Sequence, residues 1–203
     1  MCYLFGSNVY YSLFVMVNYM NVYDFDETIY DGDSSIDFYL YCLRKRPIII
    51  FFIFKQAYGV LLKKLKIINT KSMKEYFFSF LKKLDNVDEL VNSFWKINDK
   101  KIKKWYLKSK KSSDLVISAS PDFLISPICR KLKIRDAIAT KMDINTGKII
   151  GENCKGKEKV NRFYKEYPNG KILKFYSDSY TDTPLKEISN EAYLVKENNL
   201  SSW

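Results

Sequence analysis

The chain has 203 residues, of which 47% are apolar and 16% aromatic, so it can form a packed core and is not intrinsically disordered. The formal net charge of +11 favours anionic partners such as phosphate esters, anionic lipid or nucleic acid. Histidine is absent, which excludes histidine-based acid–base catalysis and removes the most common transition-metal ligand.

The first nineteen residues carry no charge. A spanning helix needs about 20 mostly apolar residues, and glycine, serine and asparagine interrupt this segment. A signal peptide would need a basic start and a small-residue cleavage site, and neither is found. We therefore treat residues 1–19 as an unassigned N-terminal extension. The interpretations are a non-native extension before Met20, a weak membrane anchor, or an additional buried segment.

The first predicted element is a buried strand from Met20 to Phe25, because β-branched and aromatic residues dominate there. It ends in a cluster of carboxylates that begins with Asp24 and Asp26. Like charges placed close together repel and are costly to desolvate, so this cluster is either a solvated turn or the binding place of a positive group. Residues 33–110 then show helical spacing, which predicts an all-helical insertion.

Strands and helices alternate in the remainder of the chain. The predicted elements are a strand over 114–118, a helix opened by Ser120 and Pro121, a hairpin turn at Asn145 to Gly147, a helix over 160–167, a strand over 171–177, a helix from Thr183, and a strand over 192–195. This alternation predicts an α/β fold with a Rossmann-like, three-layer parallel sheet. Residues 20–32 and 111–203 would form this core, and residues 33–110 a helical cap.

Three of the predicted strands end in polar side chains. The first ends at Asp24 and Asp26, the second at Ser118, and a later one at Asp178, with Asp182 following. Open α/β sheets bind ligands beyond the carboxyl ends of their strands, so we expect these groups to converge. Carboxylates and hydroxyls without histidine indicate a hard cation, and Mg²⁺ prefers such oxygen ligands.

These residues resemble the haloacid dehalogenase superfamily of phosphotransferases. DFDETI is similar to its DxDxT signature, the strand ending at Ser118 to its second motif, CKGKEKVNRF to its third, lysine-bearing motif, and SDSYTD to its acidic fourth motif. The motifs occur in the family's order over most of residues 20–195. The helical insertion resembles the cap of subfamily IB, which contains phosphoserine phosphatases and a phosphatidylglycerophosphate phosphatase.

The resemblance implies roles for the carboxylates. Asp24 would be the nucleophile that forms an aspartyl-phosphate, and Asp26 would be the general acid and base. Mg²⁺ would be held by the Asp24 carboxylate, the backbone carbonyl of Asp26 and Asp178, with Asp182 supporting the site. Without the first motif, Asp178 and Asp182 could equally be caps of the helix that begins at Thr183.

The resemblance also implies which groups bind the phosphoryl oxygens: Thr28, Ser118 and a lysine. A serine at a strand end is often only a turn residue, and Ser120 is an alternative to Ser118 or an addition to it. Lys159 is the favoured lysine, because it lies in the first turn of its helix, where the dipole also attracts phosphate. Lys155 is the alternative.

The substrate is less well defined by the sequence. Asp33 lies nine residues after Asp24, where phosphoserine phosphatases carry a glutamate that senses the amino group, so it is the candidate for substrate selection. However, Ala119-Ser120-Pro121 stands where those enzymes have a glycine pair, and DSSIDFYLYCLRKRP looks more like the cap entrance of the phosphatidylglycerophosphate phosphatase.

The apolar run IIIFFIF, with basic residues on both sides, is too short to span a bilayer. It is either the hydrophobic core of the cap, which we favour, or a segment that lies in an anionic membrane interface. The other lysine-rich segments are interpreted as solvated surface, and no nucleic-acid recognition motif is found.

The sequence therefore predicts a Mg²⁺-dependent phosphomonoesterase that acts on a small phosphorylated metabolite, with phosphoserine as a candidate. The alternatives are a lipid-phosphate phosphatase at the membrane surface and a non-catalytic binding module. The four cysteines form no CxxC pair, which argues against a zinc ribbon or a disulfide framework and fits a cytoplasmic setting. The alternative location is on, or anchored to, the inner membrane face.

Overall fold

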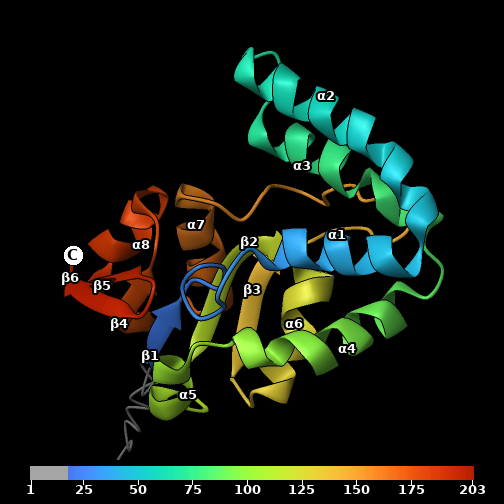
Figure 1. The fold of residues 1–203 in the computed structure, drawn as a ribbon. Helices are drawn as coiled ribbons and strands as arrows, with labels where there is room; N and C mark the ends of the chain where they lie inside the picture. The colour runs from blue at the N-terminus through green and yellow to red at the C-terminus, as the bar shows by residue number, and fades with distance from the viewer. Residues whose placement is uncertain (1–17) are drawn as a thin grey trace, which may run out of the picture.

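The structure is a computed structural model that describes residues 18–203, and its centre is a six-stranded sheet (Figure 1). The strands are β1 (Asn18–Tyr23), β2 (Leu115–Pro121), β3 (Asp136–Thr140), β4 (Gly170–Ser177), β5 (Ser189–Lys196) and β6 (Asn199–Ser202). They lie in the order β3-β2-β1-β4-β5-β6. All pairs are parallel except β5 with β6. The predicted α/β fold, with a helical segment after the first strand, is confirmed.

The helices lie between and around these strands. They are α1 (Ser34–Lys45), α2 (Ile53–Lys64), α3 (Thr70–Phe78), α4 (Val87–Asn98), α5 (Lys104–Ser109), α6 (Asp122–Lys131), α7 (Lys157–Glu166) and α8 (Thr183–Glu187). Short 3₁₀ segments are η1 (Pro47–Phe52), η2 (Ser79–Lys83), η3 (Asp99–Lys101) and η4 (Tyr180–Asp182).

The first strand begins two residues before Met20. Asn18 pairs with Gly170 and Tyr19 with Lys171, so β1 includes the last two residues of the segment that the sequence left unassigned. The three interpretations of that segment otherwise concern residues 1–17, which lie outside the described residues.

Apolar side chains cover both faces of the sheet, as expected for parallel strands. Val22, Leu115 and Phe175 belong to a hydrophobic cluster that also contains residues of α7 and α8. Tyr23 and Val116 belong to a second cluster, which includes residues of α6 and of the inserted helices. Successive residues of a strand point to opposite faces, which explains why neighbours in β1 join different clusters. The result is the predicted three-layer arrangement.

The helices inserted between β1 and β2 divide into two groups. α4 packs on α6, where the indole N–H of Trp95 donates to the carbonyl of Leu124 at 2.7 Å, and α5 packs on the sheet, where the rings of Tyr106 and Tyr23 of β1 meet at 4.9 Å. α2 and α3 form a pair that projects away from the sheet (Figure 1). Much of residues 33–110 therefore shares a hydrophobic cluster with the sheet.

The second strand is longer than predicted, and the predicted helix start is wrong. β2 continues through Ser120 to Pro121, and α6 begins at Asp122 with Pro121 in an extended conformation before it. The N–H of Ser120 donates to the Ser118 hydroxyl at 3.0 Å, which helps to hold this stretch extended. The hairpin turn at Asn145 to Gly147 is formed, closed by an isolated antiparallel bridge.

The run IIIFFIF is not the hydrophobic core of the cap, so the interpretation that we favoured is wrong. Of its seven residues only Ile49 is fully buried, whereas Phe51 and Phe54 are 67% and 76% exposed. The buried positions of α2 are limited to Gln56 and Gly59, so its other faces are left uncovered. Within residues 18–203, no helix is both long and apolar enough to cross a membrane.

Candidate active site

Three strand ends meet at one edge of the sheet. Tyr23, the last residue of β1, is in register with Val116 of β2 and Tyr176 of β4, so the polar residues that follow reach the same edge. The strand order reverses on either side of β1, and ligands of open α/β sheets bind at such a point. A cavity of about 400 Å³ opens here.

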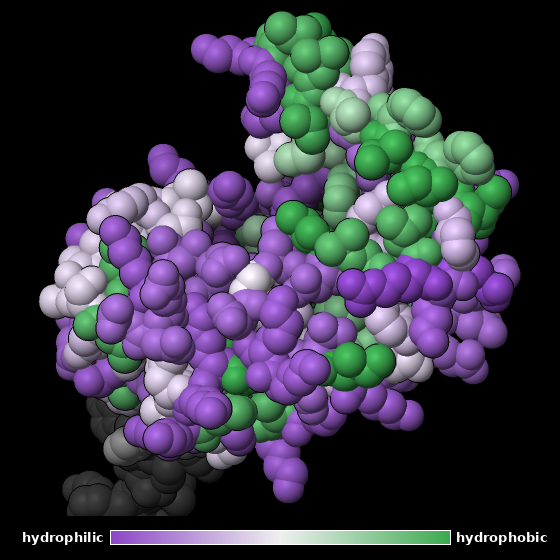
Figure 2. All heavy atoms as spheres, viewed as in Figure 1, coloured by the Kyte–Doolittle hydropathy of each residue, from purple (hydrophilic) through white to green (hydrophobic). Residues whose placement is uncertain are grey.

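Residues of all four predicted motifs and of the inserted helices line this cavity. Figure 2 shows a hollow between the α2–α3 pair and the rest of the molecule. The lining residues are Asp24, Asp26, Glu27, Asp33, Ser35, Ile36, Met73, Lys74, Phe77, Phe78, Ser118, Ala119, Ser120, Lys155, Lys159, Asp178, Ser179, Thr181 and Asp182. The predicted convergence of the strand ends is therefore present.

A tight turn after β1 positions the first two carboxylates. The carbonyl of Phe25 accepts two backbone N–H groups from later in the turn, both at 3.0 Å, and Glu27 adopts a left-handed conformation with φ of 56°. Such a conformation costs a residue other than glycine about 1–2 kcal/mol, which the surrounding contacts must offset. The ring of Phe25 is fully buried and packs edge-on against Trp95. Asp24 and Asp26, on either side of this anchor, both line the cavity.

Lys159 connects the nucleophile candidate to the fourth motif. Its side chain is 2% exposed, and its ammonium donates to carboxylate oxygens of Asp24 and Asp182, both at 2.7 Å. Burial alone would lower the pKa of Lys159, but the two carboxylates outweigh burial and raise it, so the lysine stays charged. Burial raises the pKa of Asp24; the Lys159 charge opposes this rise and the Asp182 charge adds to it.

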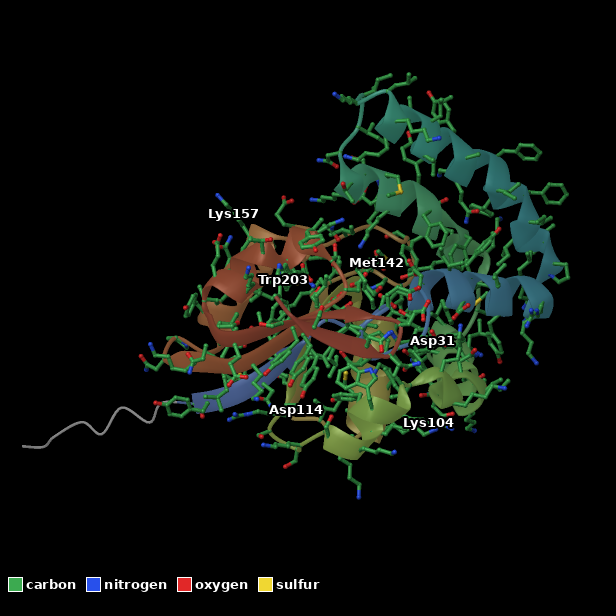
Figure 3. All side chains as sticks on the ribbon, turned by 60° about the vertical axis from the view of Figure 1, so that its left-hand side comes forward. Asp31, Lys104, Asp114, Met142, Lys157 and Trp203 are labelled. Carbon is green, nitrogen blue, oxygen red and sulfur yellow. The ribbon has the colours of Figure 1, made fainter. Side chains whose placement is uncertain are left out.

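Lys155, the alternative phosphate-binding lysine, is exposed on the cavity wall. It makes none of the contacts with Asp24 that Lys159 makes. α7 begins at Lys157, which is labelled in Figure 3, and this helix stands across the opening from the α2–α3 pair. Of the two predicted lysines, Lys159 is therefore the one whose ammonium lies close enough to Asp24 to contact a ligand bound there.

Asp26 has the environment of a carboxyl that can exchange protons near neutral pH. One oxygen accepts the backbone N–H of Ser34 at 2.7 Å, and the other accepts the Ser120 hydroxyl. Burial raises the pKa of Asp26 to about 6, the charge of Asp33 adds to this rise, and the two serines limit it. Such a pKa suits general acid–base work. Ser120, predicted as a possible phosphate ligand, thus donates a hydrogen bond to Asp26, the candidate general acid.

Asp178 lies beside Asp24, and Thr28 holds it there. The Thr28 hydroxyl accepts the backbone N–H of Asp178 at 3.0 Å and lies 3.4 Å from its carboxylate. Thr28 is fully buried and is not among the residues that line the cavity, and its role as a phosphate ligand stays a prediction. Burial raises the pKa of Asp178 and the Asp182 charge adds to this rise, whereas a backbone hydrogen bond and the Lys159 charge counteract it.

The groups around Asp24 fit a hard divalent cation. Asp24, Asp178 and the backbone carbonyl of Asp26 supply only oxygen atoms, and Mg²⁺ prefers such ligands. In residues 18–203 no group of three or more acidic or thiol side chains is gathered to hold a metal, so water would have to complete the coordination, as is usual for Mg²⁺. Asp182, predicted among the metal residues, accepts from Lys159 and from the Ser177 hydroxyl, which makes it a supporting group.

Asp33, the candidate for substrate selection, lies at the start of α1 on the cavity wall. One of its carboxylate oxygens accepts the backbone N–H groups of Ser35 and Ile36, at 2.9 and 3.0 Å, and so caps the helix. This contact gives Asp33 a structural role. Its role in substrate selection stays a prediction.

Lys74 on α3 is a lining residue that sequence reasoning missed. Its ammonium donates to the carbonyl of Ala119 at 2.7 Å and to the side-chain oxygen of Asn153 at 3.0 Å. Burial lowers the pKa of Lys74 to about 8. Met73 and Phe77 line the cavity beside it. A lysine within the apolar face of an amphipathic helix is the sequence signal that could have identified it.

The chain is an α/β protein with a cavity at the carboxyl ends of its parallel strands, and Asp24, Asp26 and the buried Lys159 line this cavity. A family model described as haloacid dehalogenase-like hydrolase matches residues 22–187, and the chain belongs to this family. Protein CicA from Caulobacter vibrioides is 30% identical over 90 residues, which are 41% of this chain and 40% of that protein. The match therefore spans less than half of this relative.

Solved structures share the fold at low sequence identity. A protein of unknown function from Bordetella pertussis Tohama I has a TM-score of 0.72 at 17% identity, over 87% of this chain and 89% of that one. A phosphoserine phosphohydrolase-like protein from Francisella tularensis has a TM-score of 0.53 at 18% identity, over 87% and 86%. At these identities the likeness concerns the fold alone.

Proposed function

We propose that the chain is a Mg²⁺-dependent phosphatase that hydrolyses phosphate monoesters through an aspartyl-phosphate on Asp24. The observation that supports this most directly is the presence of Asp24 and Asp26 in one cavity, the first bound by Lys159 and the second by Ser120. The buried Phe25 between them fixes both carboxylates relative to one another.

The two carboxylates would divide the reaction into two steps. In the first, an Asp24 oxygen attacks phosphorus, the bond from phosphorus to the ester oxygen breaks, and Asp26 gives its proton to the departing alcohol. In the second, Asp26 takes a proton from water, the resulting hydroxide attacks phosphorus, and the bond from phosphorus to Asp24 breaks. Phosphate leaves, and both carboxyls regain their starting protonation.

Other groups would bind the phosphoryl oxygens. Lys159 supplies a fixed positive charge, and the Ser118 hydroxyl, which accepts the N–H of Ser120, can donate its own proton to a ligand. Mg²⁺ held by Asp24, Asp178 and the Asp26 carbonyl would offset negative charge on the carboxylates and the phosphoryl group. Together these groups would stabilise charge on the transferring phosphoryl group, which is the main source of rate in such chemistry.

A small phosphorylated metabolite suits the cavity, whose volume is about 400 Å³. Phosphoserine is a candidate, because Lys74 offers a cation for a carboxylate and Asp33 an anion for an amino group. A similarly folded protein is described as phosphoserine phosphohydrolase-like. The segment Ala119-Ser120-Pro121, which replaces the glycine pair of those enzymes, argues for a different substrate of the same class.

A lipid phosphate of the phosphatidylglycerophosphate type is the second candidate. The exposed apolar side chains of η1 and α2 favour it, because α2 packs against α3, and α3 forms part of the cavity wall. Hydrolysis of a panel of phosphorylated metabolites and of one glycerophospholipid phosphate in mixed micelles distinguishes the candidates. Faster hydrolysis of the lipid phosphate than of phosphoserine would identify the lipid phosphate as the better substrate.

Asp24→Asn tests the proposed chemistry. The amide has the same shape but is a poor nucleophile, so Mg²⁺-dependent hydrolysis of an aryl phosphate should be lost while the circular dichroism spectrum is unchanged. The matched control is Asp31→Asn, an exposed aspartate outside the cavity lining, which should keep its activity. Activity retained by Asp24→Asn would refute the role of Asp24 as the nucleophile. A wild-type chain without hydrolysis of any monoester would favour the non-catalytic binding module.

A further inference from the structure

A continuous apolar stripe runs along the outer face of η1 and α2. Phe51, Phe54, Tyr58, Leu61 and Leu65 follow one another at intervals of three and four residues, which places them on one helical face. Their exposed fractions are 67%, 76%, 53%, 51% and 59%. Tyr58 lies at the edge of this face, since its ring also packs edge-on against Tyr76 of α3. Figure 2 shows apolar side chains gathered over α2, and Figure 3 shows side chains of this helix projecting away from the molecule. Contiguous exposure of this kind marks an interaction surface.

The segment of chain that contains the stripe carries charges of a single sign. Residues 38–74 contain nine lysines and arginines and no aspartate or glutamate. Arg44, Lys45 and Arg46 come just before η1, Lys55 lies within α2, and two lysines end this helix. The partner of this face must therefore be apolar at its centre and anionic around it.

We propose that the stripe and its basic border dock onto an anionic lipid bilayer, with η1 and α2 lying in the plane of the interface. Apolar residues on one face and lysines beside them are the pattern of helices that bind at membrane interfaces. The stripe from Phe51 to Leu65 is about 22 Å long at the rise of an α-helix, which is too short to cross a bilayer. A second copy of the chain is a poorer partner, because two such faces would bring like charges together.

The docked orientation would bring the candidate active site close to the lipid surface. α2 packs on α3 so closely that a Cβ atom added at Gly59 would lie 2.5 Å from the Cβ of Tyr76. Met73, Lys74 and Phe77 of α3 line the cavity, so one helix diameter, about 10 Å, would separate the cavity wall from the bilayer. Docking itself is independent of catalysis, whereas use of a lipid phosphate as substrate also rests on the proposed phosphatase activity.

Sedimentation with vesicles tests the docking. The full chain should bind vesicles of phosphatidylcholine mixed with phosphatidylglycerol, bind pure phosphatidylcholine far less, and be released when NaCl rises from about 0.05 to about 0.5 M. The vesicles contain no phosphate monoester, so the result does not depend on whether the chain hydrolyses one. Equal binding to both vesicle types, or no binding to either, would overturn the proposal.

Paired variants assign the binding to the stripe. Phe54→Gln and Leu61→Gln preserve the charge and should each weaken vesicle binding by about 10-fold. The matched controls are the single variants Ile97→Gln on α4 and Leu107→Gln on α5. These apolar residues are 53% and 43% exposed, and each control should bind vesicles as the wild type does. Residues 1–17 are retained in every variant, so their apolar character cannot produce the difference.

Activity on a small aryl phosphate and the circular dichroism spectrum show that the stripe variants are folded, since neither changed side chain lines the cavity. Unchanged vesicle binding by the folded stripe variants would overturn the proposal. A dimer in sedimentation-velocity experiments that both stripe substitutions dissociate, with no binding to anionic vesicles, would instead identify the face as a contact between two copies of the chain.

Discussion

A buried lysine is rare unless it is paired, and Lys159 has two partners. Its ammonium contacts Asp24 and Asp182 in a place where the lysine is only 2% exposed. Removal of one partner from a buried ion pair usually costs more stability than the pair itself contributes, because a charge is left uncompensated. Here two carboxylates share one ammonium, so one negative charge remains when both are ionised. The excess negative charge explains how a divalent cation could be accommodated beside the lysine.

Lys74 is the residue through which the inserted helices would influence substrate binding. We expect Lys74→Met to raise KM for an anionic substrate by about 10-fold and to leave kcat nearly unchanged, because a charge-assisted hydrogen bond contributes about 1.5–3 kcal/mol. Lys71→Met is the control, since Lys71 is on the same helix but outside the cavity lining. Steady-state kinetics measure both. A fall in kcat with KM unchanged would place Lys74 in the chemical step instead.

The pH dependence of binding follows from the same lysine. Burial lowers the pKa of Lys74 to about 8, so the ammonium is present below this pH and loses its proton as the pH rises through it. KM of the wild-type chain should therefore increase above about pH 8. In Lys74→Met this increase should be absent and KM should already be high at pH 7. An identical rise of KM in the variant would show that another group titrates.

At the scale of elements, α2 packs on the rest of the molecule mainly through α3. The buried residues of α2 are Gln56, whose amide donates to the carbonyl of Phe77 at 3.1 Å, and Gly59, which lies against Tyr76. Gly59→Leu should push the helices apart, and such overpacking costs about 1–3 kcal/mol. Because α2 has little other packing, we expect faster hydrogen exchange in α2 and α3 and little change in β1 and β2.

The control for this prediction is Ala57→Leu, two residues before Gly59 on an exposed position of α2. It introduces the same side chain without meeting α3, so exchange of the pair should stay close to the wild-type rate. Equal effects of the two leucines would mean that the close approach at Gly59 does not hold the pair together. Faster exchange throughout the sheet after Gly59→Leu would show that α2 and α3 are coupled to the whole fold.

At the scale of the whole molecule, the features that the sequence predicted are those with a local cause. The presence of the strands and of the hairpin turn follows from the residues at each position, and the sheet edge collects Asp24, Ser118 and Asp178 because parallel strands end together. Lys159 could be predicted because its motif opens a helix. The alternation of strand and helix predicts parallel pairing, but the order β3-β2-β1-β4-β5-β6 is known only from the structure.

The features that the sequence did not predict depend on partners far along the chain. Ser120 and Pro121 have the local pattern of a helix start, but Ser120 is held in β2, where its hydroxyl meets Asp26, 94 residues earlier. The run IIIFFIF has the composition of a core, and its exposure depends on how little packs around α2. Lys74 bonds to Ala119, which lies 45 residues later. The partners in these contacts are set by the tertiary structure, so the position of Lys74 on its helix could have marked it as unusual but could not have identified Ala119 as its acceptor.

Binding of a cation links the site to the stability of the whole chain. If Mg²⁺ binds only the folded state, a concentration about 100 times its Kd adds about 2.7 kcal/mol to the free energy of unfolding, which for a chain of this size raises Tm by about 5–10 °C. Asp178→Asn removes one proposed ligand and should largely abolish the rise, whereas Asp143→Asn, in a turn outside the cavity lining, should preserve it. Scanning calorimetry with Mg²⁺ and with a chelator measures the shift. A full rise in Asp178→Asn would mean that the cation binds elsewhere.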